Sequence, residues 1–221
     1  MIKVHHLNDS RSQRVLWLLE ELGLDYEVVR YERDPGSRLA PPALLAIHPL
    51  GKSPVIEDGD VKVAETGAVV EYLLETYGAG RLRPAAGTED GRRFTYWLHY
   101  AEGSAMPPLL LKLVFSMLPQ RAPGLVKPLV KGISAKTLTS FVDPQLRTHV
   151  GFWEDELGRS EWFAGDQFTA ADIMMSFPVE AGADRAFDPA AKPRLKAFLD
   201  KIHARPAYRR ALERGGAYSY A

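Results

Sequence analysis

The sequence contains no cysteine among its 221 residues. This absence excludes disulfides, thiolate zinc sites, a cysteine nucleophile and redox chemistry by the protein's own thiols. The chain also lacks an excess of charge of either sign, because 28 lysines and arginines balance 28 aspartates and glutamates. We therefore expect neither nucleic acid nor an anionic membrane to be the main partner.

Long apolar runs are missing as well. No stretch approaches the roughly 20 apolar residues that a bilayer-spanning helix needs. The first residues, Met1 to His6, are typical of a strand and lack the apolar core of a signal peptide. We therefore expect a soluble, cytoplasmic protein. A hydrophobic content of 46% over this length is enough for one or two domains with substantial cores.

The first third of the chain alternates between strand and helix patterns. Residues 2–7 and 26–31 are β-prone, and between them apolar residues recur at helical spacing until Gly23. A strand, a helix and a second strand favour a parallel pair. A short helix is expected at residues 44–47.

Residues 48–66 then carry a hairpin pattern. Two short apolar runs are separated by Glu57-Asp58-Gly59-Asp60, and Asp-Gly at the centre of such a turn is typical of a β-hairpin. A helix is expected from about Glu65 to Tyr77. The resulting order, β-α-β-α-β-β-α, places a strand edge near Pro54 close to a helix N-terminus, which could hold a small peptide-like molecule with a carboxylate.

The remainder of the chain predicts an all-α domain. We expect a first domain at residues 1–80, a glycine-rich linker at 81–88 and a helical domain at 89–221. Thr169 is expected to cap a helix, with Asp172 as its capping-box partner. The other expected helices cover residues 88–118 with a bend at 106–108, 125–157 after a break at 119–124, 193–204 and 206–214.

Four local motifs carry a family resemblance: Ser10-Arg11-Ser12-Gln13-Arg14-Val15, Leu50-Gly51-Lys52-Ser53-Pro54-Val55, Glu65-Thr66, and Thr169-x-x-Asp172. With the domain order, they show that essentially the whole chain resembles the cytosolic glutathione S-transferase family. Residues 10–22 further resemble the bacterial and fungal branch with a seryl-type first loop. The resemblance implies an α/β thioredoxin-like N-terminal domain and an all-α C-terminal bundle. It also implies conjugation of glutathione to a hydrophobic electrophile, no metal, and a homodimer.

The resemblance assigns glutathione binding to His48, Lys52, Ser53, Pro54, Val55, Glu65 and Thr66. It implies a cis bond before Pro54 and pairing of Val55 with the cysteinyl backbone of glutathione. Glu65 and Thr66 would hold the γ-glutamyl end, and Lys52 the glycyl carboxylate. Each residue also has a structural alternative: a strand-edge proline, caps of their own helix, a solvated lysine and a loop histidine.

Catalysis requires a group that stabilises the thiolate, since a free thiol has a pKa of about 8.5. The candidates are Ser10 first, then Ser12, then Asn8, although one of the serines is expected to be the N-cap of the first helix. Some serine-using relatives align their catalytic position nearer Asp9, and an ionised aspartate cannot donate a hydrogen bond.

The electrophile should bind in an apolar pocket between the domains. The candidates are Tyr100, Ser104, Met106, Pro107, Leu110 and Leu111, with Tyr218 and Tyr220 closing over them; aromatic residues here could equally belong to the core. Two other functions stay open. One is a glutathione-dependent disulfide or peroxide reductase, and the other is a non-catalytic glutathione-binding protein.

Overall fold

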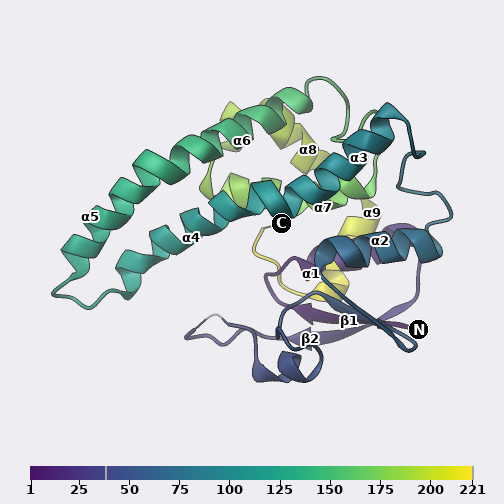
Figure 1. Ribbon diagram of the computed structural model, residues 1–221, viewed down its shortest axis with the longest axis horizontal. Coiled ribbons are helices and arrows are strands. Elements are labelled where there is room, and N and C mark those ends of the chain that lie inside the picture. Colours follow the sequence, from purple (N-terminus) through teal and green to yellow (C-terminus); the bar gives the residue numbers. More distant parts are fainter. Residues whose placement is uncertain (38, 221) are drawn as a thin grey trace.

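The computed structural model describes residues 1–37 and 39–220, which form a sheet domain followed by a helical domain (Figure 1). The sheet consists of β1 (Ile2–Leu7), β2 (Tyr26–Tyr31), β3 (Val55–Asp58) and β4 (Val61–Ala64), in the order β2-β1-β3-β4. β1 pairs parallel with β2 and antiparallel with β3, and β3 pairs antiparallel with β4. This mixed sheet confirms the predicted βαβ unit and hairpin.

Helix α1 (Ser12–Leu22) connects the two parallel strands and is buried on nearly every side. It contacts the sheet and α2 (Thr66–Tyr77), and it also packs against helices α7 (Ala170–Arg185) and α9 (Pro206–Gly215) of the second domain. Gly23 ends α1 with a φ of 67°, a left-handed conformation that glycine adopts at little cost. A short 3₁₀ helix, η1 (Pro42–Ala46), lies where residues 44–47 predicted one.

The hairpin turn differs from the expectation in one detail. The first strand of the hairpin, β3, continues through Asp58, so Gly59 and Asp60 form the loop rather than Asp58 and Gly59. Gly59 has a φ of 58°, a positive value that tight hairpin turns require and that glycine supplies. The pairing of Asp58 with Val61 closes the loop around these two residues.

The described residues of the second domain form helices and connecting loops, and none of them forms a strand. Its elements are α3 (Glu89–Tyr100), a π-helical turn η2 (Ala101–Ala105), α4 (Met106–Arg121), α5 (Lys127–Thr137), a second π-helical turn η3 (Leu138–Val142), α6 (Asp143–Glu156), α7 (Ala170–Arg185), η4 (Pro189–Ala191), α8 (Pro193–Ala204) and α9 (Pro206–Gly215).

Two predicted features of these helices need correction. The irregularity lies just before residues 106–108, as the π-helical turn η2, which ends at Ala105 and leads directly into α4. Both prolines follow at the start of α4 and have no N–H to donate to the preceding turn. The break expected from Pro119 begins only after Arg121.

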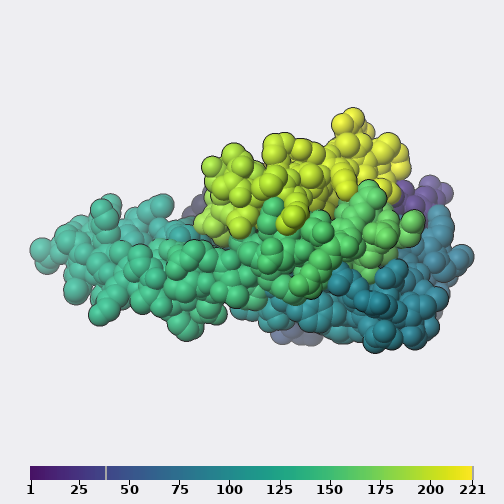
Figure 2. Space-filling view, turned by 90° about the horizontal axis from the view of Figure 1, so that it is seen from above, coloured from purple at the N-terminus to yellow at the C-terminus, as the bar shows by residue number. Residues whose placement is uncertain are grey.

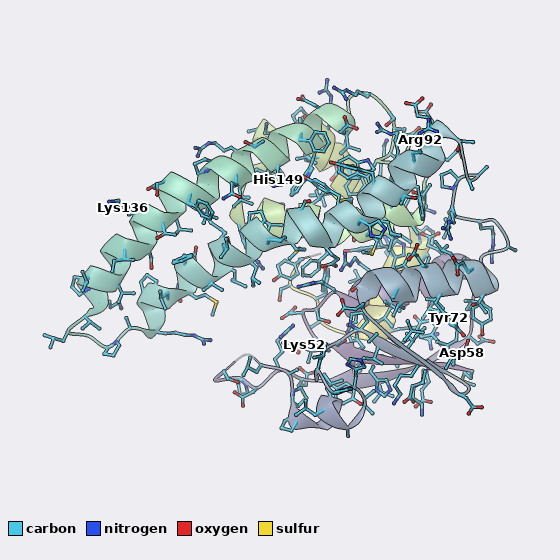
Figure 3. All side chains as sticks on the ribbon, in the orientation of Figure 1. Lys52, Asp58, Tyr72, Arg92, Lys136 and His149 are labelled. Carbon is cyan, nitrogen blue, oxygen red and sulfur yellow. The ribbon has the colours of Figure 1, made fainter. Side chains whose placement is uncertain are left out.

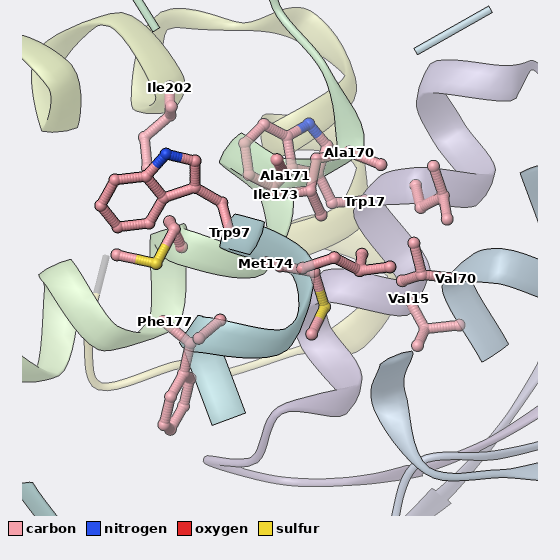
Figure 4. Close-up of a cluster of buried hydrophobic side chains, with 14 of the residues drawn as sticks. Val15, Trp17, Val70, Trp97, Ala170, Ala171, Ile173, Met174, Phe177 and Ile202 are labelled. Atoms are coloured by element: carbon pink, nitrogen blue, oxygen red, sulfur yellow. The ribbon is translucent and has the colours of Figure 1, made fainter. Parts of the chain in front are cut away.

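Helix α7 is the central element of the helical domain. Figure 4 shows its Ile173 and Met174 between Trp17 of α1 and Trp97 of α3, so one apolar core spans both domains. The predicted capping box is confirmed. The amide of Ala171 donates to Thr169 Oγ1 at 3.2 Å, and the amide of Thr169 donates to Asp172 Oδ2 at 2.8 Å. Asp172 Oδ1 also accepts from the amide of Phe163 at 2.9 Å, which anchors the preceding loop.

Helices α4 and α5 extend together beyond the remaining helices (Figures 1 and 2). We call residues 106–137 the arm. Its apolar residues are only partly covered by the other helices of the chain, whereas the two domains themselves pack closely on each other.

Candidate functional site

A cavity of about 570 Å³ lies between the two domains. Ten of the predicted residues line it: Ser10, His48, Lys52, Ser53, Pro54, Glu65, Thr66, Met106, Leu110 and Tyr220. Figure 3 places Lys52 on the loop of the sheet domain that faces the helical domain. The cavity walls therefore come from segments far apart in the sequence, including the loop after β1, the entry to β3, the N-terminus of α2, one face of α4, and α7.

The entry to β3 supplies a backbone edge. The Ser53–Pro54 peptide bond is cis, as the resemblance implied. Ser53 Oγ donates to the carbonyl of His5 at 2.8 Å and accepts from the amide of Leu7 at 3.2 Å, so the side chain fastens this turn to β1. The peptide groups of Ser53 precede the ladder, which begins at Val55.

Val55 does not have the predicted position. It is 1% exposed and lies between His5 of β1 and Ala64 of β4, and it does not line the cavity. Its backbone is part of the interior of the sheet, whereas Ser53, the residue before the proline, lines the cavity.

The N-terminus of α2 borders the cavity opposite this edge. Glu65 precedes the helix with a φ of 72°, which is uncommon for a residue other than glycine. Its side chain makes no capping hydrogen bond, so Glu65 does not cap its own helix, which was the alternative to a binding role. Thr66 is buried and opens the helix. The first amides of α2 are therefore available for an anion.

A buried ion cluster that the sequence analysis missed supports Thr66. Arg14 of α1 is 1% exposed; its Nη1 donates to the carbonyl of Met174 at 2.8 Å, and its Nη2 lies 3.5 Å from Thr66 Oγ1. Glu102 of η2 accepts from both Arg14 and Arg11. Burial alone would raise the pKa of Glu102, but the two guanidinium groups outweigh it and lower that pKa. This cluster could have been predicted from the sequence, because Arg14 lies on the buried face of an otherwise apolar helix.

The loop after β1 separates the three catalytic candidates. Only Ser10 lines the cavity. Ser12 is fully buried, and its Oγ contacts Ser10 Oγ at 2.7 Å and His6 Nδ1 at 2.8 Å. Asn8 points to the neighbouring loop instead, because its Oδ1 accepts from the amide of Arg33 at 2.9 Å. Asp9 lines the cavity, and its Oδ1 accepts from the amide of Ser219 at 2.9 Å.

The predicted serine N-cap of α1 is not observed, because Arg11 is the N-cap and its side chain makes no capping hydrogen bond. Ser10 Oγ accepts from the amide of Ser12 at 3.2 Å, so Ser10 satisfies a first-turn donor while also lining the cavity. His6 lies behind the two serines, 3% exposed. Burial, with a smaller contribution from Arg30, lowers the pKa of His6 to about 4, so its imidazole is neutral at pH 7.

The apolar wall is one face of α4. Met106, Leu110, Leu113 and Met117 follow one another at helical spacing and all line the cavity. Pro107 and Leu111 lie off this face, and Ser104 is exposed on η2. The period starting from Met106 could have identified Leu113 and Met117 from the sequence.

Tyr100 belongs to the core rather than to the cavity. It is 7% exposed, and its hydroxyl contacts His149 Nδ1 and accepts from Trp153 Nε1 at 3.0 Å.

Phe177 and Arg185 of α7 complete the wall of the cavity together with Tyr220. Tyr220 packs on Phe177 with ring centroids 5.3 Å apart, and its hydroxyl accepts from Arg185. Tyr218 does not line the cavity; its hydroxyl donates to Glu180 at 2.6 Å.

The structure describes residues 1–37 and 39–220. They contain no group of three or more histidine, aspartate or glutamate side chains that could hold a metal ion. No helix among them is long and apolar enough to cross a membrane.

Comparison with known proteins gives a consistent result over the whole chain. Residues 1–75 match the glutathione S-transferase N-terminal domain, and residues 116–206 match the glutathione S-transferase C-terminal domain. Glutathione S-transferase 3 of Schizosaccharomyces pombe is 34% identical, with 97% of this chain and 88% of the relative covered. Glutathione S-transferase 1 of Saccharomyces cerevisiae is 32% identical, with 98% and 96% covered.

The fold comparison agrees. A glutathione S-transferase structure from Actinobacillus pleuropneumoniae superposes with a TM-score of 0.80 at 32% identity, covering 100% of this chain and 95% of that one. A sphingomonad glutathione S-transferase complexed with glutathione superposes with a TM-score of 0.71 at 25% identity, covering 97% and 98%. With both domains and the interdomain cavity in place, this chain belongs to the glutathione S-transferase family.

Proposed function

We propose that this glutathione S-transferase binds glutathione along the sheet-domain wall of the cavity and conjugates it to a hydrophobic electrophile held against α4. The observation that carries the proposal is the meeting of a backbone edge, Ser53–Pro54, and an uncapped helix N-terminus, Glu65–Thr66, in one cavity. An extended peptide with a carboxylate at each end requires these two features.

Each end of glutathione has a chemically suited group. The γ-glutamyl carboxylate would accept from Thr66 and the first amides of α2, while the Glu65 carboxylate would hold the ammonium. The glycyl carboxylate would meet Lys52, with His48 beside it. Ser53 would pair with the cysteinyl backbone, which directs the sulfur toward Ser10 and the N-terminal end of α1. A positive helix end lowers the pKa of a thiol.

The electrophile side is apolar and large enough for a small aromatic molecule. Met106, Leu110, Leu113 and Met117 present one continuous face opposite the sheet domain. Desolvation by this face would strengthen the nucleophile and exclude water from the reacting sulfur.

Binding tests the proposal directly. Isothermal titration calorimetry with millimolar glutathione should show binding that Lys52→Ala and Thr66→Ala each weaken by about tenfold, since a hydrogen bond to a charged group is worth 1.5 kcal/mol or more. Lys196→Ala, an exposed lysine paired with Asp200 on α8, is the matched control and should bind like the parent. Absence of binding by the parent, or equal affinity in all four proteins, would contradict the proposed site.

Activity separates the transferase from the glutathione-dependent reductase. Conjugation of chlorodinitrobenzene should exceed reduction of hydroxyethyl disulfide, because an apolar wall faces the thiol and the chain has no cysteine of its own. The reverse ratio would favour the reductase, and binding without turnover of either substrate would favour a non-catalytic protein.

The proposal includes a two-fold homodimer in the cytoplasm, with the arm and the adjoining turns η2 and η3 as its contact surface. Seven apolar side chains at residues 114, 118, 125, 126, 129, 133 and 141 are between 42% and 96% exposed. Residues 103–142 hold five lysines and arginines and no acidic residue, which leaves the rest of the chain with a net negative charge. A second copy would cover the apolar residues and complement the charge. Sedimentation should show a dimer that Ile133→Glu dissociates.

A further inference from the structure

A single cation borders the apolar wall of the cavity. The helical domain contributes seven residues to the described lining, and Arg185, in the last turn of α7, is the one charged residue among them. The other six are the four residues of the α4 face, Phe177 and Tyr220. The side chain of Arg185 is only 11% exposed. Withdrawing a cation from water costs free energy unless anionic or polar partners face it.

The partners within the chain leave much of this guanidinium group unused. Arg185 Nε donates to Asp184 Oδ2 at 3.1 Å, and Nη2 donates to the hydroxyl of Tyr220. The side chain of Asp184 is 59% exposed, so water screens its attraction for Arg185. An arginine has five N–H donors, and among the described residues the other three have no hydrogen-bond partner. The group can therefore still donate to a ligand in the cavity.

Tyr220 offers a second donor at the same place. The guanidinium carbon of Arg185 lies 5.3 Å from the centre of its ring, and the ring also packs on Phe177. Because the hydroxyl oxygen of Tyr220 accepts from Arg185, its own proton remains for another acceptor, and no described residue accepts it. A carboxylate that meets both groups would receive hydrogen bonds from a cation and from a hydroxyl.

The two residues before Tyr220 hold it in this position from both domains. The hydroxyl of Tyr218 donates to Glu180 Oε2 of α7 at 2.6 Å. The amide of Ser219 donates to Asp9 Oδ1, in the loop after β1, at 2.9 Å. The donors of Arg185 and Tyr220 are therefore preorganised, which reduces the entropic cost of binding a ligand between them.

Arg185 lies away from the end of the cavity that the proposed function gives to the γ-glutamyl group. Arg14, whose Nη2 is 3.5 Å from Thr66 Oγ1, donates to the carbonyl of Met174 on α7. Arg185 follows Met174 by eleven residues, which is about 16 Å along a helix that rises 1.5 Å per residue. Helix α7 also packs on α4, which carries the apolar face. This position assigns the unused donors to the electrophile.

We propose that Arg185 and Tyr220 form an anion subsite, so that the enzyme prefers electrophiles that combine an apolar ring with a carboxylate. This inference rests on the proposed function, because it concerns the second substrate in the same cavity. The α4 face would hold the ring, and the two donors would hold the carboxylate. The glutathione sulfur bonds to the ring carbon that bears the leaving group, the leaving group departs with the electron pair of its bond, and the thiol proton goes to solvent.

A cation in the last turn of α7 also interacts favourably with the negative end of the helix. That interaction contributes to stability whichever substrate is bound. Its loss would change the conjugation of charged and neutral electrophiles equally, whereas loss of an anion subsite affects only the charged one. A matched pair of substrates therefore separates the two roles.

The test compares 4-chloro-3-nitrobenzoate with 4-chloro-3-nitrobenzotrifluoride, in which a neutral group replaces the carboxylate and chloride is again the leaving group. Arg185→Met should lower kcat/KM for the benzoate by about tenfold or more, the size of one hydrogen bond to a charged group, and should change kcat/KM for the trifluoride by less than about twofold. Arg185→Lys keeps the charge and should lose less than Arg185→Met. Tyr220→Phe should also lower kcat/KM for the benzoate alone. KM for glutathione should stay at the parent value in all three.

Arg209→Met is the matched control, because it removes an exposed arginine of α9 that donates to the carbonyl of His203 and does not line the cavity. Both substrates should react with it as with the parent. Equal falls for the two substrates, no fall for the benzoate, or a raised KM for glutathione in the Arg185 variants would each overturn the inference. If Arg185→Met does not fold, Arg185→Lys and Tyr220→Phe decide by the same comparison.

The parent protein separates the two levels. A parent that conjugates neither chloroarene and binds no glutathione in calorimetry refutes the proposed function. A parent that conjugates the trifluoride, but not the benzoate, refutes only the anion subsite.

Discussion

Replacement of Glu102 by alanine should destabilise the protein by about 3 kcal/mol, because it leaves Arg14 buried without its carboxylate. Removing one partner of a buried ion pair costs about 3 to 5 kcal/mol. The lower end applies here because Arg14 keeps the carbonyl of Met174, and because the Glu102 side chain is 26% exposed and therefore partly screened by water. Glu102→Gln keeps an acceptor and should cost about 2 kcal/mol.

Urea unfolding at pH 7 measures this change as a shift of the transition midpoint at constant slope. Asp200→Ala is the control, since it breaks an exposed pair with Lys196 on α8 and should change stability by less than about 0.5 kcal/mol. Arg14→Met in combination with Glu102→Ala should cost less than the two single changes together, because each single change leaves the other charge unpaired.

The pH dependence provides a second check. The pKa of Glu102 is below its ordinary value of 4.5 in the folded protein, so its contribution is complete above that pH and is lost as pH falls through the folded pKa. The parent and Glu102→Ala should therefore converge in acid. If Glu102→Ala costs no more than Asp200→Ala at pH 7, the cluster does not hold the domains together and the reasoning fails.

Three further results are expected. Asp172→Ala should cost at least about 3 kcal/mol in the same unfolding assay, since it leaves two buried amides unsatisfied, whereas the exposed cap Asp188→Ala should cost about 1 kcal/mol or less. Because the folded pKa of His6 is lowered to about 4, parent stability should fall by up to roughly 3 kcal/mol from pH 6.5 to pH 4, and His6→Gln should flatten that slope. Leu113→Ser should raise KM for chlorodinitrobenzene but not for glutathione, whereas Lys196→Ala on α8, which does not line the cavity, should change neither.

The cavity residues of the sheet domain were largely predictable because they lie in short segments whose local geometry is set by their own residues. Pro54, Glu65 and Thr66 were identified from a hairpin pattern and a helix start, and all three line the cavity. Val55, which was predicted to pair with the ligand, lies two positions after Ser53, the residue that lines the cavity. Strand patterns do not reveal where a ladder begins, and here only the pairing of Val55 with His5 and Ala64 shows that its backbone belongs to the sheet.

The apolar wall of the cavity was less predictable because it depends on how helices rotate against each other. Tyr100 and Met106 are separated by the π-helical turn η2, which changes the face that the following residues present. As a result Tyr100 turns into the core while Met106 and Leu110 face the cavity. Helical periodicity defines which residues share a face, but only packing decides which face meets the ligand.

The sequence by itself determined the elements, their order, the capping box at Thr169 and the resemblance to the transferases, since these depend on periodicity, turn residues and contiguous motifs. Only the tertiary structure decided the roles of Ser10, Ser12 and Asn8. Three polar residues within five positions are equivalent in a sequence. The fold turns Asn8 toward the amide of Arg33, buries Ser12 against His6 and leaves Ser10 at the cavity, because partners distant in the chain compete for each side chain.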